Sequence, residues 1–313
     1  MALTFLAFLA PMLIAQDAAL PVTPAQRPAA KSSRVAAADD SPGTIATGYS
    51  GHFACRSFSD INRKLAAAVS DQEPQRVAQL IRDGADINAR SDSTGRMTML
   101  QVAVLHDWGV ESIRLLIVAG AQVDARDARG ATALSIACQD ELGPDPAVIQ
   151  LLLQAGADVN AAGSTGRTPL MYAALCDPKG QVVALLIESS ADVSARDKMG
   201  WTALMHACRR RKENVDVVRM LIEAGAVVNT SHRQGGTALS IAAYFGQAEV
   251  AKMLVESGAK VNTSDAGNWT PLLCSSFGGH LPIVDLLLRS GADIQATDRL
   301  GRTALRMART NKH

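Results

Sequence analysis

Aromatic side chains are scarce in this sequence. Phe, Trp and Tyr together make up 4% of the 313 residues, whereas apolar residues as a class make up 48%. A core built from large rings is therefore excluded, and the buried contacts have to come from Ala, Leu, Val and Ile. Side chains of this size favour helices that pack closely against one another.

A surplus of charge is absent as well. Lys plus Arg amounts to 31 and Asp plus Glu to 30, which gives a net charge of +1. No overall field attracts nucleic acid or an anionic membrane, so the sequence predicts neither as a partner. The densest basic run, Arg209-Arg210-Arg211-Lys212, has no aromatic residue interleaved with it. It is interpreted as a solvated turn, with a patch for nucleic acid or an acidic partner as the alternative.

Motifs of catalytic and nucleotide-binding sites are missing. The sequence has no Gly-x-Gly-x-x-Gly after a strand, no Gly-x-x-x-x-Gly-Lys, no His-Glu-x-x-His and no Gly-x-Ser-x-Gly. Each of these patterns places the groups that its chemistry needs, and without them a site for phosphate, metal or acyl transfer has no recognisable frame. We expect no catalytic residue, no cofactor and no enzyme activity.

A hydrophobic run long enough to cross a bilayer is also lacking. Residues 3–15 are apolar and uncharged, but a spanning helix needs about 20 such residues. The length is typical of a secretory signal, although no Lys or Arg precedes the run. The sequence predicts a cleaved signal over residues 1–19 and a secreted or periplasmic protein, without stable membrane insertion after cleavage. A cytoplasmic or N-terminally anchored protein is the alternative. Residues 20–57, rich in Ala, Pro, Ser and Thr, are predicted to be a flexible linker.

The remaining chain is dominated by an internal repeat. A Thr-x-Leu tripeptide starts at Thr98, Thr132, Thr168, Thr202, Thr237, Thr270 and Thr303, so that successive copies lie 34, 36, 34, 35, 33 and 33 residues apart. A Gly-Ala pair keeps the same period, at Gly84, Gly120, Gly156, Gly225, Gly258 and Gly291, and Ser190-Ala191 takes its place once. Two markers in phase over more than 200 residues indicate a repeat architecture.

Each unit has the pattern of two helices and a turn. In one unit, Thr237 is placed to cap a first helix, and Gly246 interrupts the chain after it. Val250, Met253 and Leu254 then follow at helical spacing, and Gly258 ends the second helix. One such unit cannot bury its apolar face alone, so we expect seven full units and a terminal half to form one stacked domain over residues 58–313.

The repeat pattern predicts the conformation of Ser190 and the polarity of the last unit. Ser190 stands where six other units have Gly, so we expect it in a left-handed conformation that costs about 1 kcal/mol relative to Gly. The last unit has only a first helix, and its Arg302, Arg306, Arg309 and Lys312 are expected to form a polar cap that meets water.

These units resemble ankyrin repeats. The resemblance rests on the Thr-Pro-Leu starts, the paired alanines, the Gly-Ala markers and the Asp-x-x-Gly turns at Asp127, Asp197 and Asp298. The His that usually follows Thr-Pro-Leu in the family is replaced in every unit. The resemblance implies an all-α solenoid of helix-turn-helix units with short protruding turns. It also implies that the turn tips and the exposed side of the first helices form a concave surface for a protein partner.

The five cysteines contain no Cys-x-x-Cys pair. Cys138 and Cys208 occupy a repeat position where a small buried residue is expected, and helices 8–10 Å apart are too distant for a disulfide between equivalent positions. We expect buried free thiols, with a disulfide as the alternative. His206 and Cys208 are metal-ligand types, but no further ligand accompanies them, so no metal site is predicted.

Two tryptophans, Trp201 and Trp269, immediately precede the Thr of their units. They either form an edge that contacts a partner or pack against the neighbouring turn. The residues expected at the turn tips differ freely, as a binding surface requires: Arg129, Thr165, Met199, Gln234, Asn268 and Leu300.

The sequence thus predicts a monomeric, non-catalytic adaptor that binds a protein whose identity the fold leaves open. The alternatives are an inhibitor or accessory module of an enzyme, or a catalytic role within the groove.

Overall fold

The computed structural model describes residues 58–91, 95–140, 143–209 and 214–310. These residues form fifteen helices and no strand, which confirms the predicted all-α class. The first helices of the units are α3 (Asp60–Ser70), α5 (Met99–Leu105), α7 (Ala133–Ala137), α9 (Pro169–Cys176), α11 (Ala203–Ala207), α13 (Ala238–Phe245), α15 (Pro271–Gly278) and α17 (Ala304–Thr310). The second helices are α4 (Pro74–Arg82), α6 (Val110–Val118), α8 (Pro146–Gln154), α10 (Gln181–Glu188), α12 (Val215–Glu223), α14 (Ala248–Glu256) and α16 (Leu281–Arg289).

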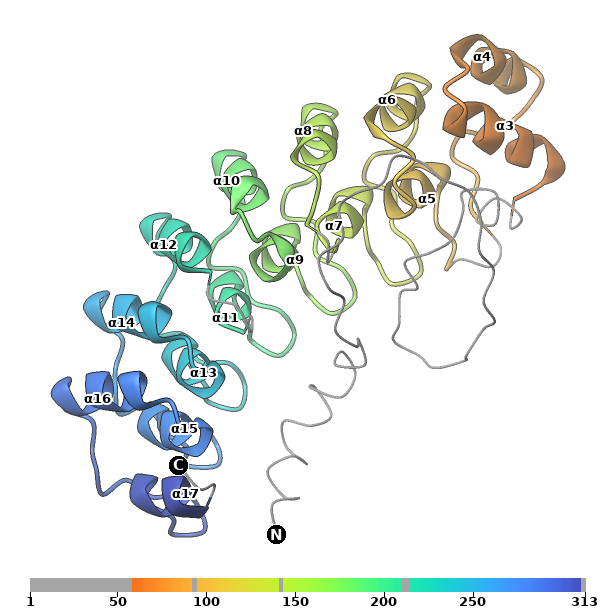
Figure 1. Ribbon diagram of the computed structural model, residues 1–313. Coiled ribbons are helices and arrows are strands. Elements are labelled where there is room, and N and C mark those ends of the chain that lie inside the picture. Colours follow the sequence, from red (N-terminus) through yellow and green to blue (C-terminus); the bar gives the residue numbers. More distant parts are fainter. Residues whose placement is uncertain (1–57, 92–94, 141–142, 210–213, 311–313) are drawn as a thin grey trace.

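The helix pairs stack in a single curved row (Figure 1). The first helices follow the inner side of the arc and the second helices follow the outer side. Each of the seven pairs packs together, and each unit contacts its neighbours along the row. No described helix has both the length and the apolar character that crossing a bilayer requires. The predicted signal over residues 1–19 and the predicted linker over residues 20–57 lie outside the described residues.

The repeated threonines begin the first helices. The hydroxyl oxygens of Thr98, Thr132, Thr202, Thr237 and Thr270 accept a hydrogen bond from the amide three residues later. At Thr98, Thr132 and Thr237 the side chain of that third residue bonds back to the threonine amide, which completes a capping box. The predicted capping role of Thr237 is confirmed, whereas the hydroxyl of Thr168 makes no such bond.

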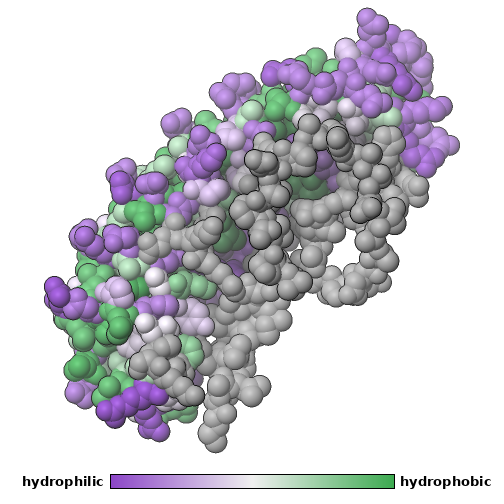
Figure 2. All heavy atoms as spheres, in the orientation of Figure 1, coloured by the Kyte–Doolittle hydropathy of each residue, from purple (hydrophilic) through white to green (hydrophobic). Residues whose placement is uncertain are grey.

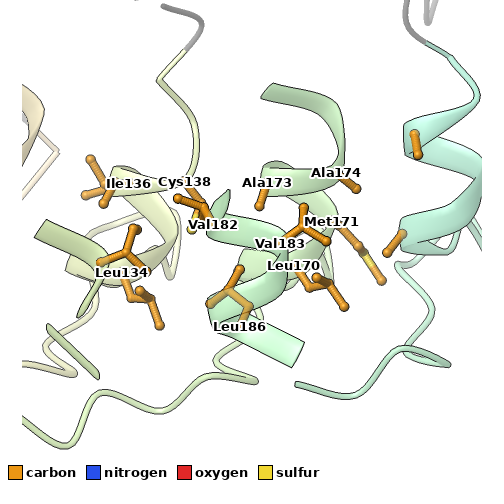
Figure 3. Close-up of a cluster of buried hydrophobic side chains, with 14 of the residues drawn as sticks. Leu134, Ile136, Cys138, Leu170, Met171, Ala173, Ala174, Val182, Val183 and Leu186 are labelled. Atoms are coloured by element: carbon orange, nitrogen blue, oxygen red, sulfur yellow. The ribbon is translucent and has the colours of Figure 1, made fainter. Parts of the chain in front are cut away.

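Small and branched aliphatic side chains fill the space between the units (Figure 3). The leucine of the Thr-x-Leu tripeptide is at most 1% exposed in six units, as at Leu134 and Leu170. Ala173 and Ala174 are completely buried, which lets neighbouring first helices approach closely. Val182, Val183 and Leu186 of the second helix α10 close the same cluster. The core is therefore continuous along the stack, as the scarcity of aromatic residues predicts.

Asparagine side chains link most of the units at the ends of the second helices. Asn160 donates to the Ser190 carbonyl at 3.4 Å and accepts from the Asp192 amide at 2.8 Å. Asn88, Asn229 and Asn262 make the same pair of bonds to the unit that follows each of them. Ser194 occupies this position between the α10 and α12 units, and its shorter side chain makes neither bond.

Replacing Ser194 with Asn is expected to raise the free energy of unfolding by about 1 kcal/mol. The new amide would donate to the Gly225 carbonyl and accept from the Val227 amide, and an exposed hydrogen bond contributes about 0.5 kcal/mol or slightly more. Urea unfolding followed by circular dichroism measures the change. Ser194→Ala, which adds neither group, is the control, and equal stability of the two variants would contradict the role assigned to the asparagines.

Ser190 has a φ of +67°, as the sequence predicts, whereas Gly156 and Gly225 have +85° and +92° at the same position. Since an L side chain is strained there, Ser190→Gly should stabilise the protein by about 1 kcal/mol. The matched control is Gly156→Ala, where an added Cβ would meet no atom within 4 Å. We expect that variant to lose a similar amount through backbone strain alone. Thermal melting of both variants tests the pair, and a lower melting temperature for Ser190→Gly would refute the assignment.

The two ends of the stack differ in polarity. Hydrophilic residues cover α3 and α4, whereas hydrophobic residues are exposed around the C-terminal units (Figure 2). Arg306 and Arg309 are exposed on α17, as expected of a cap. Leu305 beside them is 62% exposed, however, so the expectation of a polar cap is only partly correct. No second helix follows α17 among the described residues, and none of them covers this leucine fully.

Candidate protein-interaction surface

Four of the protruding turns between units are closed by an acidic side chain at their base. One carboxylate oxygen of Asp197 accepts hydrogen bonds from the Met199 and Trp201 amides, both at 2.8 Å. Asp127, Asp265 and Asp298 hold their own turns in the same way. His232 takes this position once, where its Nδ1 accepts from the Gln234 amide at 3.1 Å. The shape of these five tips is thus set by a residue below each tip and not by the tip side chains.

Main-chain hydrogen bonds join each tip to the next. The Ser164 amide donates to the Arg129 carbonyl at 2.8 Å, and the Lys198 amide donates to the Thr165 carbonyl at 2.9 Å. The same bond recurs from Ala128 to Gly95, from Arg233 to Met199, from Ala266 to Gln234 and from Arg299 to Gly267. The tips therefore form one connected row along the inner side of the arc. We call this series of bonds the tip ladder.

The predicted tip residues all lie on this row, with different exposure. Arg129, Thr165, Asn268 and Leu300 are exposed, and Met199 and Gln234 are half-buried. Asn268 has a φ of +61°, at a place where most of the tips carry Gly. Asn tolerates this left-handed conformation better than most other residues that have a side chain, so the backbone at this position is compatible with Asn.

The two tryptophans pack at the base of the tips. Trp201 is 8% exposed and Trp269 is 3% exposed. The Trp201 ring stacks on His232 with ring centres 5.0 Å apart, and the Trp269 ring meets Phe277 edge to face at 5.3 Å. Trp201 therefore packs against the neighbouring turn, whereas Trp269 packs against the first helix of its own unit.

Half-buried aromatic residues on the inner helices offer more contact area than the tryptophans. Tyr244 and Phe245 end α13, and Phe277 lies in the last turn of α15. The Tyr244 ring stacks on Phe277 across the unit boundary at 6.4 Å and meets Phe245 edge to face at 5.3 Å. We call these three residues the aromatic patch. Tyr244 and Phe277 occupy the same place in their units, which is the sequence signal that marks this patch.

A buried polar cluster lies below the central tips. His206 Nε2 is 3.8 Å from Asp197 Oδ2, and Arg167 Nε is 3.6 Å from the same oxygen. Both separations exceed hydrogen-bond length, and neither ring nitrogen of His206 has another partner in the described part of the chain. Burial, aided by Arg167 and Arg209, lowers the pKa of His206 although Asp197 opposes the shift. The imidazole is sealed from solvent, so it is poorly placed to exchange protons with a bound substrate.

The described residues form neither a metal-binding cluster nor a reactive thiol site. His, Cys, Asp and Glu nowhere gather there in the groups of three that would hold a metal ion. Cys138, Cys208 and Cys274 are buried free thiols, and burial raises the pKa of each, so that they remain protonated. Cys176 is half-buried, while Cys55 and the basic residues 210–212 lie outside the described ranges.

Comparison with known proteins identifies the repeat. The sequence matches the family model of ankyrin repeats (3 copies) in five overlapping stretches, residues 65–163, 100–197, 141–232, 178–265 and 228–298. No curated protein matches the chain. Ankyrin repeats generally serve as protein–protein interaction modules. Since the matched stretches together cover well over half of the sequence, the chain belongs to the ankyrin repeat family.

Proposed function

We propose that this protein is a non-catalytic adaptor that binds a partner protein through the inner surface of the arc. The observation that carries the proposal is the tip ladder, which holds a row of chemically different side chains in a fixed order. A rigid row lowers the ordering cost of binding, because the tips need not be immobilised when the partner arrives. A stable interface buries about 800 Å² on each partner, and a surface that spans seven units can supply this area.

The aromatic patch is the proposed anchor of this surface. Interfaces depend on a few residues, and aromatic side chains in half-enclosed positions are enriched among them. Tyr244, Phe245 and Phe277 lie on inner helices of adjacent units and support one another through ring contacts. The exposed tip residues Asn268 and Arg129 then supply polar contacts that select the partner. Trp201 and Trp269 support the surface from below.

The double variant Tyr244→Ala/Phe277→Ala tests this anchor. We expect at least a tenfold loss of affinity for the purified partner, identified beforehand by pull-down with the full chain. Each truncated hot-spot residue costs about 1–2 kcal/mol or more. Both rings are half-buried, so the helical circular dichroism signal should remain near that of the original protein.

Val118→Ala is the matched control, because Val118 is 82% exposed but lies on the outer row of helices. It should bind as the unmodified chain does. Equal binding by the double variant and the control would refute the inner surface as the contact region.

We also propose that the protein is exported. The support is the uncharged apolar run of residues 3–15, whose length fits a secretory signal. Mass spectrometry of the mature protein tests this proposal, with loss of about the first 19 residues as the expected result. An intact Met1 would contradict it. The adaptor function does not depend on the outcome.

A further inference from the structure

The C-terminal end of the stack exposes a face that is buried in every earlier unit. Leu305 is 62% exposed, whereas the leucines at the same repeat position are at most 1% exposed: Leu100, Leu134, Leu170, Leu204, Leu239 and Leu272. Each earlier first helix packs against the second helix of its own unit. In the described chain α17 packs against α15 and has no second helix of its own. None of the described helices therefore fills the place that a second helix takes in the earlier units.

This open place is lined by a continuous apolar surface. A pocket of about 230 Å³ lies where α15, α16 and α17 meet. We call its outer part the C-terminal apolar face, which consists of Leu281, Val284, Leu288, Ile294, Leu305 and Ala308. Leu281 and Ile294 are 74% and 58% exposed. Figure 2 shows hydrophobic residues gathered at this end of the molecule, in contrast to the hydrophilic covering of α3 and α4.

The neighbouring units show what kind of element fits there. The second helix α16 lies against α15 and completely buries Ile283 and Leu287, which are four residues apart. Residues at this spacing form one stripe of a helix. An occupant that lies on α17 as α16 lies on α15 thus needs two aliphatic residues four positions apart on one helix.

The charges around the face specify the flanks of this helix. Residues 281–310 contain five arginines and three aspartates. Asp285 and Asp298 are already paired with Arg289 and Arg302, at 3.0 and 2.6 Å. In the described part of the chain, Arg299, Arg306 and Arg309 have no carboxylate partner. On α17, Arg306 and Arg309 form the stripe next to Leu305 and Ala308, about 100° around the helix.

We propose that the C-terminal apolar face binds an amphipathic helix of a partner protein, with an aliphatic pair at i and i+4 and acidic residues on the adjacent stripe. The partner helix completes the last unit of the stack, in the helix-in-groove mode of recognition. Its carboxylates meet Arg306 and Arg309. A second copy of this chain is disfavoured as the occupant, because it would bring two arginine-rich rims together. This site is separate from the tips and the aromatic patch, so it does not depend on the proposed adaptor surface.

Fluorescence anisotropy with a stapled helical peptide tests the proposal on the full chain. The peptide carries Ile and Leu four residues apart and glutamates on the adjacent stripe, and its twin has lysines in place of the glutamates. We expect saturable binding of the glutamate peptide and at least tenfold weaker binding of the lysine peptide. Leu305→Glu should weaken binding at least tenfold without loss of helicity, since this side chain is exposed. Val118→Glu, an equal change on an exposed valine of the outer row, should leave binding unchanged.

Three results would overturn the proposal. The first is equal affinity for the two peptides, since the rim charges would then have no role. The second is undiminished binding to Leu305→Glu, which would place the peptide elsewhere. The third is a dimer of the full chain in light scattering that Leu305→Glu dissociates, because the occupant would then be a second copy.

Discussion

Replacing Trp201 with alanine is expected to lower the free energy of unfolding by about 3–5 kcal/mol, the range for truncation of a large buried ring. The Trp201 side chain is 8% exposed and lies between His232, at 5.0 Å, and His206, at 5.4 Å between ring centres. These residues come from two units, so the loss falls on an interface between repeats as well as on one turn. Urea unfolding followed by circular dichroism measures the effect.

Trp201→Phe is the control, because it retains a ring against His232 and should lose clearly less stability than the alanine variant. A loss below about 1 kcal/mol for Trp201→Ala would show that the ring is not part of the packed core. The comparison also separates the tryptophans from the aromatic patch, whose truncation should affect partner binding much more than folding.

Replacing His206 with isoleucine is expected to raise the free energy of unfolding by about 1–3 kcal/mol at neutral pH. Both ring nitrogens of His206 are buried without a hydrogen-bond partner in the described chain, and an unsatisfied buried polar group costs about this much. Ile136 and Ile241 occupy the equivalent position in two other units and are 6% and 8% exposed. An isoleucine therefore fits the space that the fold provides there.

The same variant should change how stability depends on pH. Burial lowers the pKa of His206 below the usual histidine value of about 6.5, so below that pH the unfolded chain binds a proton that the folded chain does not. Well above pH 6.5 the protonation of His206 therefore has no effect on stability. As the pH falls from 6.5 toward the folded-state pKa, protonation of the unfolded chain progressively lowers the free energy of unfolding. His206→Ile should lose less stability between pH 7.5 and pH 5 than the original protein. A smaller slope will remain, because burial also lowers the pKa values of His106 and His232.

Urea unfolding at pH 7.5 and pH 5 measures both effects. His106→Gln is a suitable comparison for the pH effect, since His106 is half-buried and belongs to another unit. A destabilised His206→Ile protein at pH 7.5 would mean that the ring nitrogens have partners after all. An unchanged slope with pH would mean that His206 titrates alike in the folded and unfolded chains.

Local signals in the sequence account for most of the fold. Thr237 and Gly246 mark the start and end of α13 because capping and left-handed conformations depend on side chains close by in the sequence. The sequence predicts a left-handed conformation at Ser190 for the same reason, and the φ of +67° confirms it. Regular spacing then fixes the stack, since each unit contacts only its neighbours.

The candidate surface was less predictable, because it depends on contacts between units. Trp201 is buried by His232, which lies 31 residues further along the chain, and no local pattern shows that the two rings stack. Tyr244 and Phe277 become neighbours only when two units are placed side by side. The exposure of Leu305 depends likewise on the absence of a covering helix among the described residues. The position of a residue within its repeat therefore does not show whether its side chain is buried or exposed.

The tip ladder has a consequence for how the binding specificity of such a chain can change. All six of its bonds join a main-chain amide to a main-chain carbonyl, so the side chains at Arg129, Thr165 or Met199 take no part in them. Mutations there change the side chains that can contact a binding partner, while the spacing between neighbouring tips stays constant. Selection, or a laboratory library, can therefore exchange exposed tip residues such as Arg129 and Thr165 singly and retain the scaffold, so at these positions recognition can change with little effect on folding.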